Sequence, residues 1–108
     1  MTVLTIRSHK RYAVRQAIRL RQTGAKPVSG LMIELSSEGC RISNLGRPGF
    51  AVGEPVSVEV DGIELTGKLR WMHDGIAGVR LDTALFSNQL AELIARGRGE
   101  AGELRYGT

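Results

Sequence analysis

Residues Leu31 to Ser43 read LMIELSSEGCRIS, and the fold predicted for the whole chain depends on this stretch. Read with a period of two, Leu31, Ile33 and Leu35 fall on one face of a strand, and the residues between them fall on the other. A turn follows over residues 36–39, whose glycine is expected to supply the backbone freedom of a tight reversal. The pattern therefore predicts a β-hairpin with one buried face.

The second limb of this hairpin also alternates, with Cys40 and Ile42 expected inside the fold. Burial of the aliphatic face leaves Glu34, Ser36 and Arg41 displayed together on the outside. A carboxylate, a hydroxyl and a cation on one exposed ledge are typical of a polar binding surface.

Upstream of the hairpin, Arg11 and Arg15 lie four residues apart in the segment KRYAVRQ. Arg11-x-x-x-Arg15 followed by Glu34-x-Ser36-x-x-Gly39 resembles the two-part signature of PilZ domains, RxxxR and then [D/N]xSxxG. PilZ domains are bacterial receptors for the second messenger cyclic di-GMP. The resemblance extends from about residue 10 to residue 82.

The resemblance implies that six residues bind cyclic di-GMP: Lys10, Arg11, Arg15, Glu34, Ser36 and Gly39. The two arginines would contact phosphate and guanine as a mobile arm becomes ordered over the ligand. A guanidinium group can donate hydrogen bonds both to phosphate and to the O6/N7 edge of guanine. The serine would donate to a phosphate, and the glycine would let the backbone come close. Lys10 would be an auxiliary phosphate contact.

One position departs from the family pattern, since Glu34 stands where the family has Asp or Asn to read the guanine N1 and N2 donors. A carboxylate of either length can accept these hydrogen bonds. The extra methylene shifts the acceptor by more than about 1 Å, a displacement large enough to weaken a contact that needs precise placement. We expect binding weaker than with Asp, or binding that requires the strand to adjust.

Charge is unevenly distributed along the 108 residues, although the net charge is only +4. Residues 1–33 contain no acid and seven basic side chains: Arg7, Lys10, Arg11, Arg15, Arg19, Arg21 and Lys26. The remainder of the chain has eight basic residues against eleven acidic ones. This asymmetry predicts an anionic partner for the N-terminal third.

Composition narrows the class of protein. The length predicts one domain, and 42% hydrophobic residues fit a globular chain without an apolar run that could span a membrane. No signal peptide is recognised at the N-terminus, and the single cysteine, Cys40, suits a reducing cytoplasm. His9 and His73 lack partners at metal-ligand spacing, so neither a metal site nor a cofactor is expected.

The fold expected is all-β, a small antiparallel barrel of six or seven strands with one short C-terminal helix, as in PilZ domains. Residues 1–14 are expected to form a flexible basic arm, residues 15–96 the barrel and its closing helix, and residues 97–108 a disordered tail. The helix is predicted over residues 85–96, with a stripe of Phe86, Leu90, Leu93 and Ile94, and with Gly97 ending it.

Two later hairpins are expected. In the first, a turn at residues 61–62 sets Val58 opposite Leu65 and Val60 opposite Ile63.

In the second hairpin, a three-residue loop over 73–75 gives the better register, with Leu69 opposite Val79 and Trp71 facing the core. It also sets Lys68 opposite Arg80 on the outer face, with Arg70 nearby. Like charges directly opposite each other on neighbouring strands lower stability, which indicates an anion or an acidic partner near this face.

Three functions fit the sequence. The first is a cyclic di-GMP receptor that relays binding to an unidentified downstream protein by a conformational change. The second is a degenerate PilZ adaptor that binds no nucleotide, for which Glu34 is the sequence evidence. The third, a nucleic-acid-binding barrel, is disfavoured because the five aromatic residues do not share a strand face. An enzyme is not expected, since no nucleophile–base pair or set of inward carboxylates is recognised.

Overall fold

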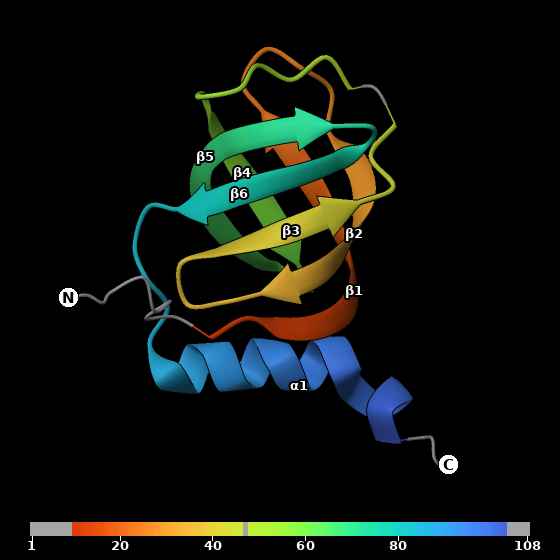
Figure 1. Cartoon of the computed structure of the whole chain (residues 1–108), viewed down its shortest axis with the longest axis vertical. Coiled ribbons are helices and arrows are strands. Elements are labelled where there is room, and N and C mark those ends of the chain that lie inside the picture. The colour runs from red at the N-terminus through yellow and green to blue at the C-terminus, as the bar shows by residue number, and fades with distance from the viewer. Residues whose placement is uncertain (1–9, 47, 104–108) are drawn as a thin grey trace, which may run out of the picture.

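Six strands form a closed barrel, and one helix lies against its end (Figure 1). The computed structural model describes residues 10–46 and 48–103, with side chains up to residue 98. The elements are β1 (Tyr12–Gln22), β2 (Val28–Leu35), β3 (Gly39–Ser43), β4 (Pro55–Val60), β5 (Ile63–His73), β6 (Ile76–Leu81) and α1 (Ser87–Glu103). Neighbouring strands are antiparallel and follow the order β1-β2-β3-β6-β5-β4 around the barrel. The predicted all-β barrel with a C-terminal helix is confirmed.

The β4–β5 hairpin follows the predicted register. Val58 pairs with Leu65 and Val60 with Ile63, so that the apolar side chains share the barrel interior. Positive φ angles of 49° and 80° at the two turn residues, 61 and 62, give the two-residue turn that matches strand twist. Alternation, turn chemistry and burial agree here, which is why the sequence pattern predicted this part well.

In β2, however, the predicted assignment of faces is wrong except at Leu35, which is buried as expected. Met32 and Glu34 pair with consecutive residues of β3, so Ile33 is an extra residue in the strand. Met32 is therefore fully buried, while Leu31 and Ile33 are only half-buried. A β-bulge interrupts the two-residue alternation on which the prediction relied. Glu34 still faces outward, as expected.

The β5–β6 hairpin also differs from its prediction, and the cause is again a β-bulge. Its turn contains two residues, Asp74 and Gly75, and not the three predicted. Arg70 is instead an extra residue in β5, because Leu69 and Trp71 pair with consecutive residues of β6. This extra residue restores the predicted pairing of Leu69 with Val79. The bulge turns Arg70 and Trp71 both outward, and Trp71 is 40% exposed. The core position predicted for Trp71 is therefore wrong.

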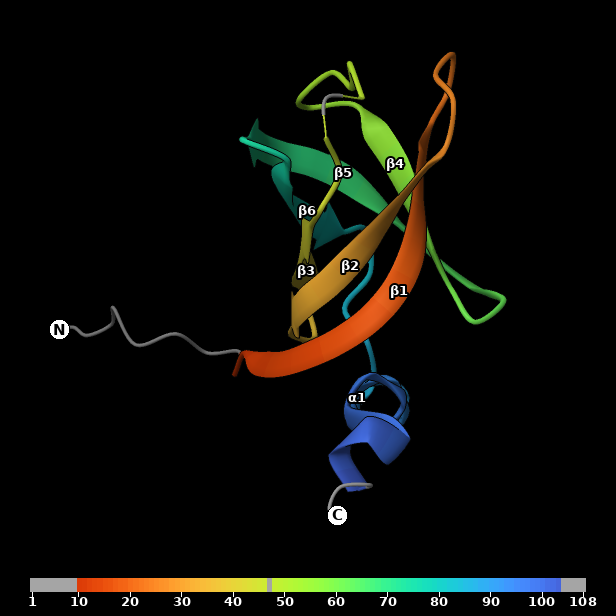
Figure 2. The ribbon, with the colours of Figure 1, turned by 90° about the vertical axis from the view of Figure 1, so that its right-hand side faces the viewer.

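Helix α1 runs across the barrel end beside β1 (Figures 1 and 2). It buries Leu93, whereas Phe86 precedes the helix and is 72% exposed, so the predicted stripe does not include Phe86. The prediction that Gly97 ends the helix is also wrong. A Cβ at Gly97 would lie 2.8 Å from the Cβ of Val14, so the glycine is needed for close packing of helix and strand.

The predicted terminal segments are only partly described. β1 begins at Tyr12, so the last residues of the predicted arm belong to the barrel. The helix continues to Glu103 through much of the predicted tail. Residues 1–9 and 104–108 lie outside the described residues, and the predictions made for them stay predictions. No helix among the described residues is long and apolar enough to cross a membrane.

The contact between Gly97 and Val14 gives a test of helix docking. We expect Gly97→Leu to lower the free energy of unfolding by about 1–3 kcal/mol, because the added side chain overpacks the interface. Ala95→Leu, at an exposed position of the same helix, should change it by no more than about 0.5 kcal/mol. Urea unfolding measures both. Equal effects of the two variants would show that α1 does not pack on β1 as described.

Candidate functional site

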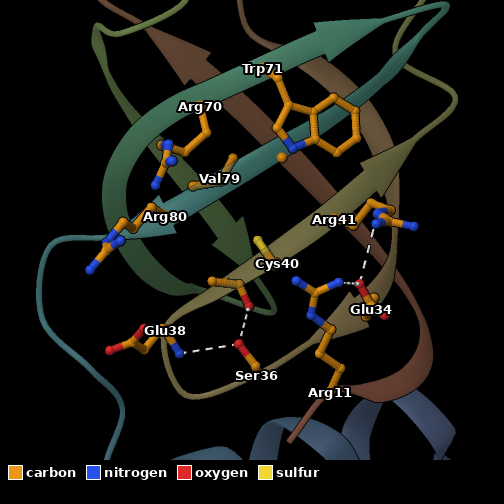
Figure 3. A pocket seen from close by; sticks show the side chains of 12 residues that line it. Arg11, Glu34, Ser36, Glu38, Cys40, Arg41, Arg70, Trp71, Val79 and Arg80 are labelled. Atoms are coloured by element: carbon orange, nitrogen blue, oxygen red, sulfur yellow. Dashed lines mark hydrogen bonds and ion pairs between the residues drawn. The ribbon is translucent and has the colours of Figure 1, made fainter. Parts of the chain in front are cut away.

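A pocket of about 290 Å³ opens on the outer face of the barrel, over β2, β3, β5 and β6 (Figure 3). It is lined by Arg11, Glu34, Ser36, Glu38, Gly39, Cys40, Arg41, Arg70, Trp71, Gly78, Val79 and Arg80. Residues from the start of the described chain, from the central hairpin and from the β5–β6 hairpin thus share one hollow. The barrel topology causes this, because it places β3 directly beside β6.

The structure brings together four of the six residues predicted to bind the ligand. Arg11, Glu34, Ser36 and Gly39 line the pocket, whereas Lys10 and Arg15 do not. The ammonium of Lys10 lies 5.8 Å from the centre of the Tyr12 ring. Arg15 is exposed on β1, beside the register shift between β1 and β2.

Glu34 lies between two guanidinium groups. Its Oε1 is 3.7 Å from Nη1 of Arg11 and 3.7 Å from Nε of Arg41. Partly exposed ion pairs at this distance contribute only about 0–1 kcal/mol each. The carboxylate therefore gathers both cations at the pocket without being locked to either of them.

Ser36 organises the turn beside this carboxylate. Its N–H donates to the carbonyl of Gly39 at 2.9 Å, and its hydroxyl accepts from the N–H of Glu38 at 3.2 Å. The hydroxyl also donates to the Gly39 carbonyl at 3.4 Å (Figure 3). Local bonds of this kind are ordinary turn chemistry. The role of Ser36 as a phosphate donor stays a prediction.

Two glycines permit the close packing that shapes the pocket. Gly39 does not have a positive φ, so the expected reason for it, a tight reversal, is wrong. A Cβ there would instead collide with the carbonyl oxygen of Val79 on β6. At Gly78, a Cβ would collide with the indole of Trp71, which lies against this bare backbone. Larger residues at either position would push β3, β6 or the indole outward.

Sequence reasoning missed the wall of the pocket that the β5–β6 hairpin contributes. It found Arg70 and Arg80 on an outer face, but did not connect them with the hairpin motif and placed Trp71 inside. The guanidinium carbon of Arg41 lies 5.7 Å from the Trp71 ring centre, within cation–π range. The bulge that exposes Trp71 has no signature in the sequence, so only the register of the strands could reveal this wall.

The pocket thus combines several guanidinium groups with an aromatic face and a carboxylate. Guanidinium groups bind phosphate and the acceptor edges of guanine, a carboxylate binds amide-like donors, and an indole face packs against planar rings. Among the described residues, no cluster of three His, Cys, Asp or Glu side chains could hold a metal ion. The chemistry of the pocket suits an organic anion that carries a planar base.

Comparisons with known proteins identify a family and a fold for the chain. The family model described as PilZ domain matches residues 5–96. A search of solved structures matches the crystal structure of the PilZ domain of CeSA from a cellulose synthesizing bacterium, with a TM-score of 0.60 and 18% sequence identity. That match covers 82% of this chain and 94% of the other. No curated protein sequence matches the chain.

Cys40 lines the base of the pocket but is almost wholly buried. Burial raises the pKa of its thiol from 9.0 to about 12, because the apolar surroundings disfavour the thiolate. The thiol is therefore neutral at physiological pH and is a poor nucleophile. It acts as a small core side chain, as the sequence predicted.

Because of this pKa shift, the free energy of unfolding should depend on pH in the alkaline range. Between pH 9.0 and about 12 the unfolded chain loses the thiol proton while the folded chain keeps it. Stability should therefore fall as pH rises through this window, by up to about 1.4 kcal/mol per pH unit from this group. In Cys40→Ala, we expect the free energy of unfolding, measured with urea, to fall less steeply with pH in this window, although the variant is less stable at neutral pH. Identical slopes for the two proteins would contradict the burial of the thiol.

Proposed function

The chain belongs to the PilZ domain family, and we propose that it binds cyclic di-GMP in the pocket over β2, β3, β5 and β6. The observation that carries this proposal is the convergence of both halves of the motif: Arg11 lies in the same pocket as Glu34, Ser36 and Gly39. In the sequence Arg11 lies 23 positions before Glu34. Their meeting around a hollow of about 290 Å³ supports a ligand site.

The ligand carries two phosphates and two guanines, and the pocket offers a group for each. Arg11 and Arg41 can each bind a phosphate or the O6/N7 edge of guanine bidentately. The carboxylate of Glu34, held by weak ion pairs, can exchange them for the guanine N1 and N2 donors. Arg15 would turn from its exposed position toward the ligand as the segment around Arg11 orders, with Lys10 as an auxiliary phosphate contact.

Helix α1 is attached to both halves of the motif, which suggests how binding could reach a partner. Leu81 N–H, at the end of β6, donates to the carbonyl of Glu38 at 2.8 Å. Leu85 N–H, in the segment that leads into the helix, donates to the carbonyl of Ser37 at 2.8 Å. Farther along the helix, Nε of Arg98 donates to the carbonyl of Ala13 at 3.0 Å.

The second attachment lies between the two motif arginines. Ala13 and Val14, which contact α1, separate Arg11 from Arg15. A ligand that draws these arginines over the pocket would therefore pull on the strand segment that holds the helix. We propose that a shift of α1 relays binding to a downstream protein, and that the chain works as a non-catalytic receptor in the bacterial cytoplasm.

A second candidate function is a PilZ adaptor without nucleotide affinity. The observation that favours it is the position of Glu34, whose longer side chain already bridges Arg11 and Arg41. In this case the ion pairs would close the site, and protein contacts alone would carry the function.

Calorimetry with cyclic di-GMP separates the two candidates. For a receptor, we expect micromolar binding that Arg11→Ala and Arg15→Ala each weaken by about tenfold or more, because each removes a charge-assisted contact. Glu34→Asp should strengthen binding, since it restores the acceptor position of the family. Arg19→Ala, an exposed β1 arginine outside the pocket, is the matched control and should leave affinity unchanged.

Absence of heat at high micromolar ligand with wild type, together with binding by Glu34→Asp, would identify a degenerate site. Absence of binding by both proteins would overturn the receptor proposal.

The relay is tested by hydrogen exchange. Saturation with cyclic di-GMP should change the exchange of α1 amides, while the β4–β5 turn serves as an internal reference that stays constant. In Arg98→Ala the attachment to Ala13 is lost, so the ligand should still bind but change α1 less. If α1 exchanged identically with and without ligand in the saturated wild type, the helix would not be the relay.

A further inference from the structure

Three cations lie together on the outer face of β5 and β6. Lys68 and Arg80 are paired directly across the two strands, and the bulge turns Arg70 outward beside them. All three are exposed. Arg70 and Arg80 line the pocket, on the side away from Arg11 and Glu34 (Figure 3).

Among the described residues, these three cations have no acidic partner, in contrast to Arg21 and Arg96. Arg21 pairs with Glu59 at 3.1 Å, and Arg96 pairs with both Asp61 and Glu92 at 3.1 Å. Within residues 10–46 and 48–98, by contrast, no ion pair joins Lys68, Arg70 or Arg80 to a carboxylate.

Such an arrangement costs stability. Like charges directly opposite on neighbouring strands are destabilising by a fraction of a kcal/mol. A bound anion would reverse the sign of this effect, because its oxygens can accept from several donors at once. The geometry of the arginines favours an oxyanion such as a phosphodiester, which matches the fork of a guanidinium group.

We propose that Arg70 and Arg80, supported by Lys68, form a phosphodiester-binding site that completes the pocket. The inference rests on the proposed function, since the phosphodiester assigned to this site belongs to the dinucleotide held by Glu34 and Arg11. The ligand would thus lie across β3, with one part at the motif hairpin and a phosphate at the β5–β6 wall. Neither half of the RxxxR and [D/N]xSxxG signature contains these three residues.

The test compares single variants in calorimetry with cyclic di-GMP and with guanosine. Arg70→Ala and Arg80→Ala should each weaken binding of the dinucleotide by about tenfold, and Lys68→Ala by less. Arg70→Lys should recover part of the loss, since it restores the charge but not the fork. Arg19→Ala is again the control. Binding of guanosine, which has no phosphate, should be unchanged in every one of these variants.

Equal affinity of wild type, Arg70→Ala and Arg80→Ala for cyclic di-GMP would overturn the inference and leave the proposed function intact. If wild type does not bind the dinucleotide at all, a titration with inorganic phosphate followed by NMR decides. Saturable shifts at Arg70 and Arg80, without shifts at Arg19, would support an anion site independent of the nucleotide. Absence of selective shifts there would refute the site.

Discussion

Closure of the barrel is the constraint on which the pocket depends. Each strand must keep its apolar side chains inside while pairing with both neighbours, and in the described strands the register shifts at three places. These shifts lie between β1 and β2, between β2 and β3, and between β5 and β6. All three are beside the pocket. Each extra residue changes which side chains face outward, so the same irregularities that let the sheet curve also assemble the polar wall.

The β2–β3 hairpin connects the pocket with the rest of the molecule. Its outer face presents Glu34 and Ser36, its inner face buries Met32 and Ile42, and the carbonyls of its turn bind the segment that leads to α1. A movement of this turn is therefore coupled by backbone hydrogen bonds to the position of the helix. The exposed Phe86 lies at the end of this segment, where a displacement would alter an apolar surface.

Much of the fold could be predicted from the sequence, because periodicity and turn residues agreed. The β4–β5 hairpin is the clearest case, and the pairing of Lys68 with Arg80 was also correct. The bulges could not be predicted, since an extra residue such as Ile33 or Arg70 leaves no local mark. Gly97 was misread for a related reason: a glycine that ends a helix and a glycine that permits close packing look the same in sequence.

The candidate site was predicted about as far as its motif extends. Arg11, Glu34, Ser36 and Gly39 meet as expected, but Arg15 and Lys10 lie outside the pocket. Trp71 and the two arginines of the β5–β6 wall joined the pocket through strand order and a bulge. Pocket residues that belong to a linear motif can be recognised in the sequence. Pocket residues that strand pairing around the barrel brings together can be recognised only in the structure.

The most direct test of a ligand site shared by the two hairpins is an NMR titration of backbone amides with cyclic di-GMP. The structure predicts shifts that saturate together at residues 34–41, at Arg70 and Trp71, and at residues 78–80. Shifts confined to the loop over residues 48–54, which does not line this pocket, or no shifts at saturating ligand, would contradict it.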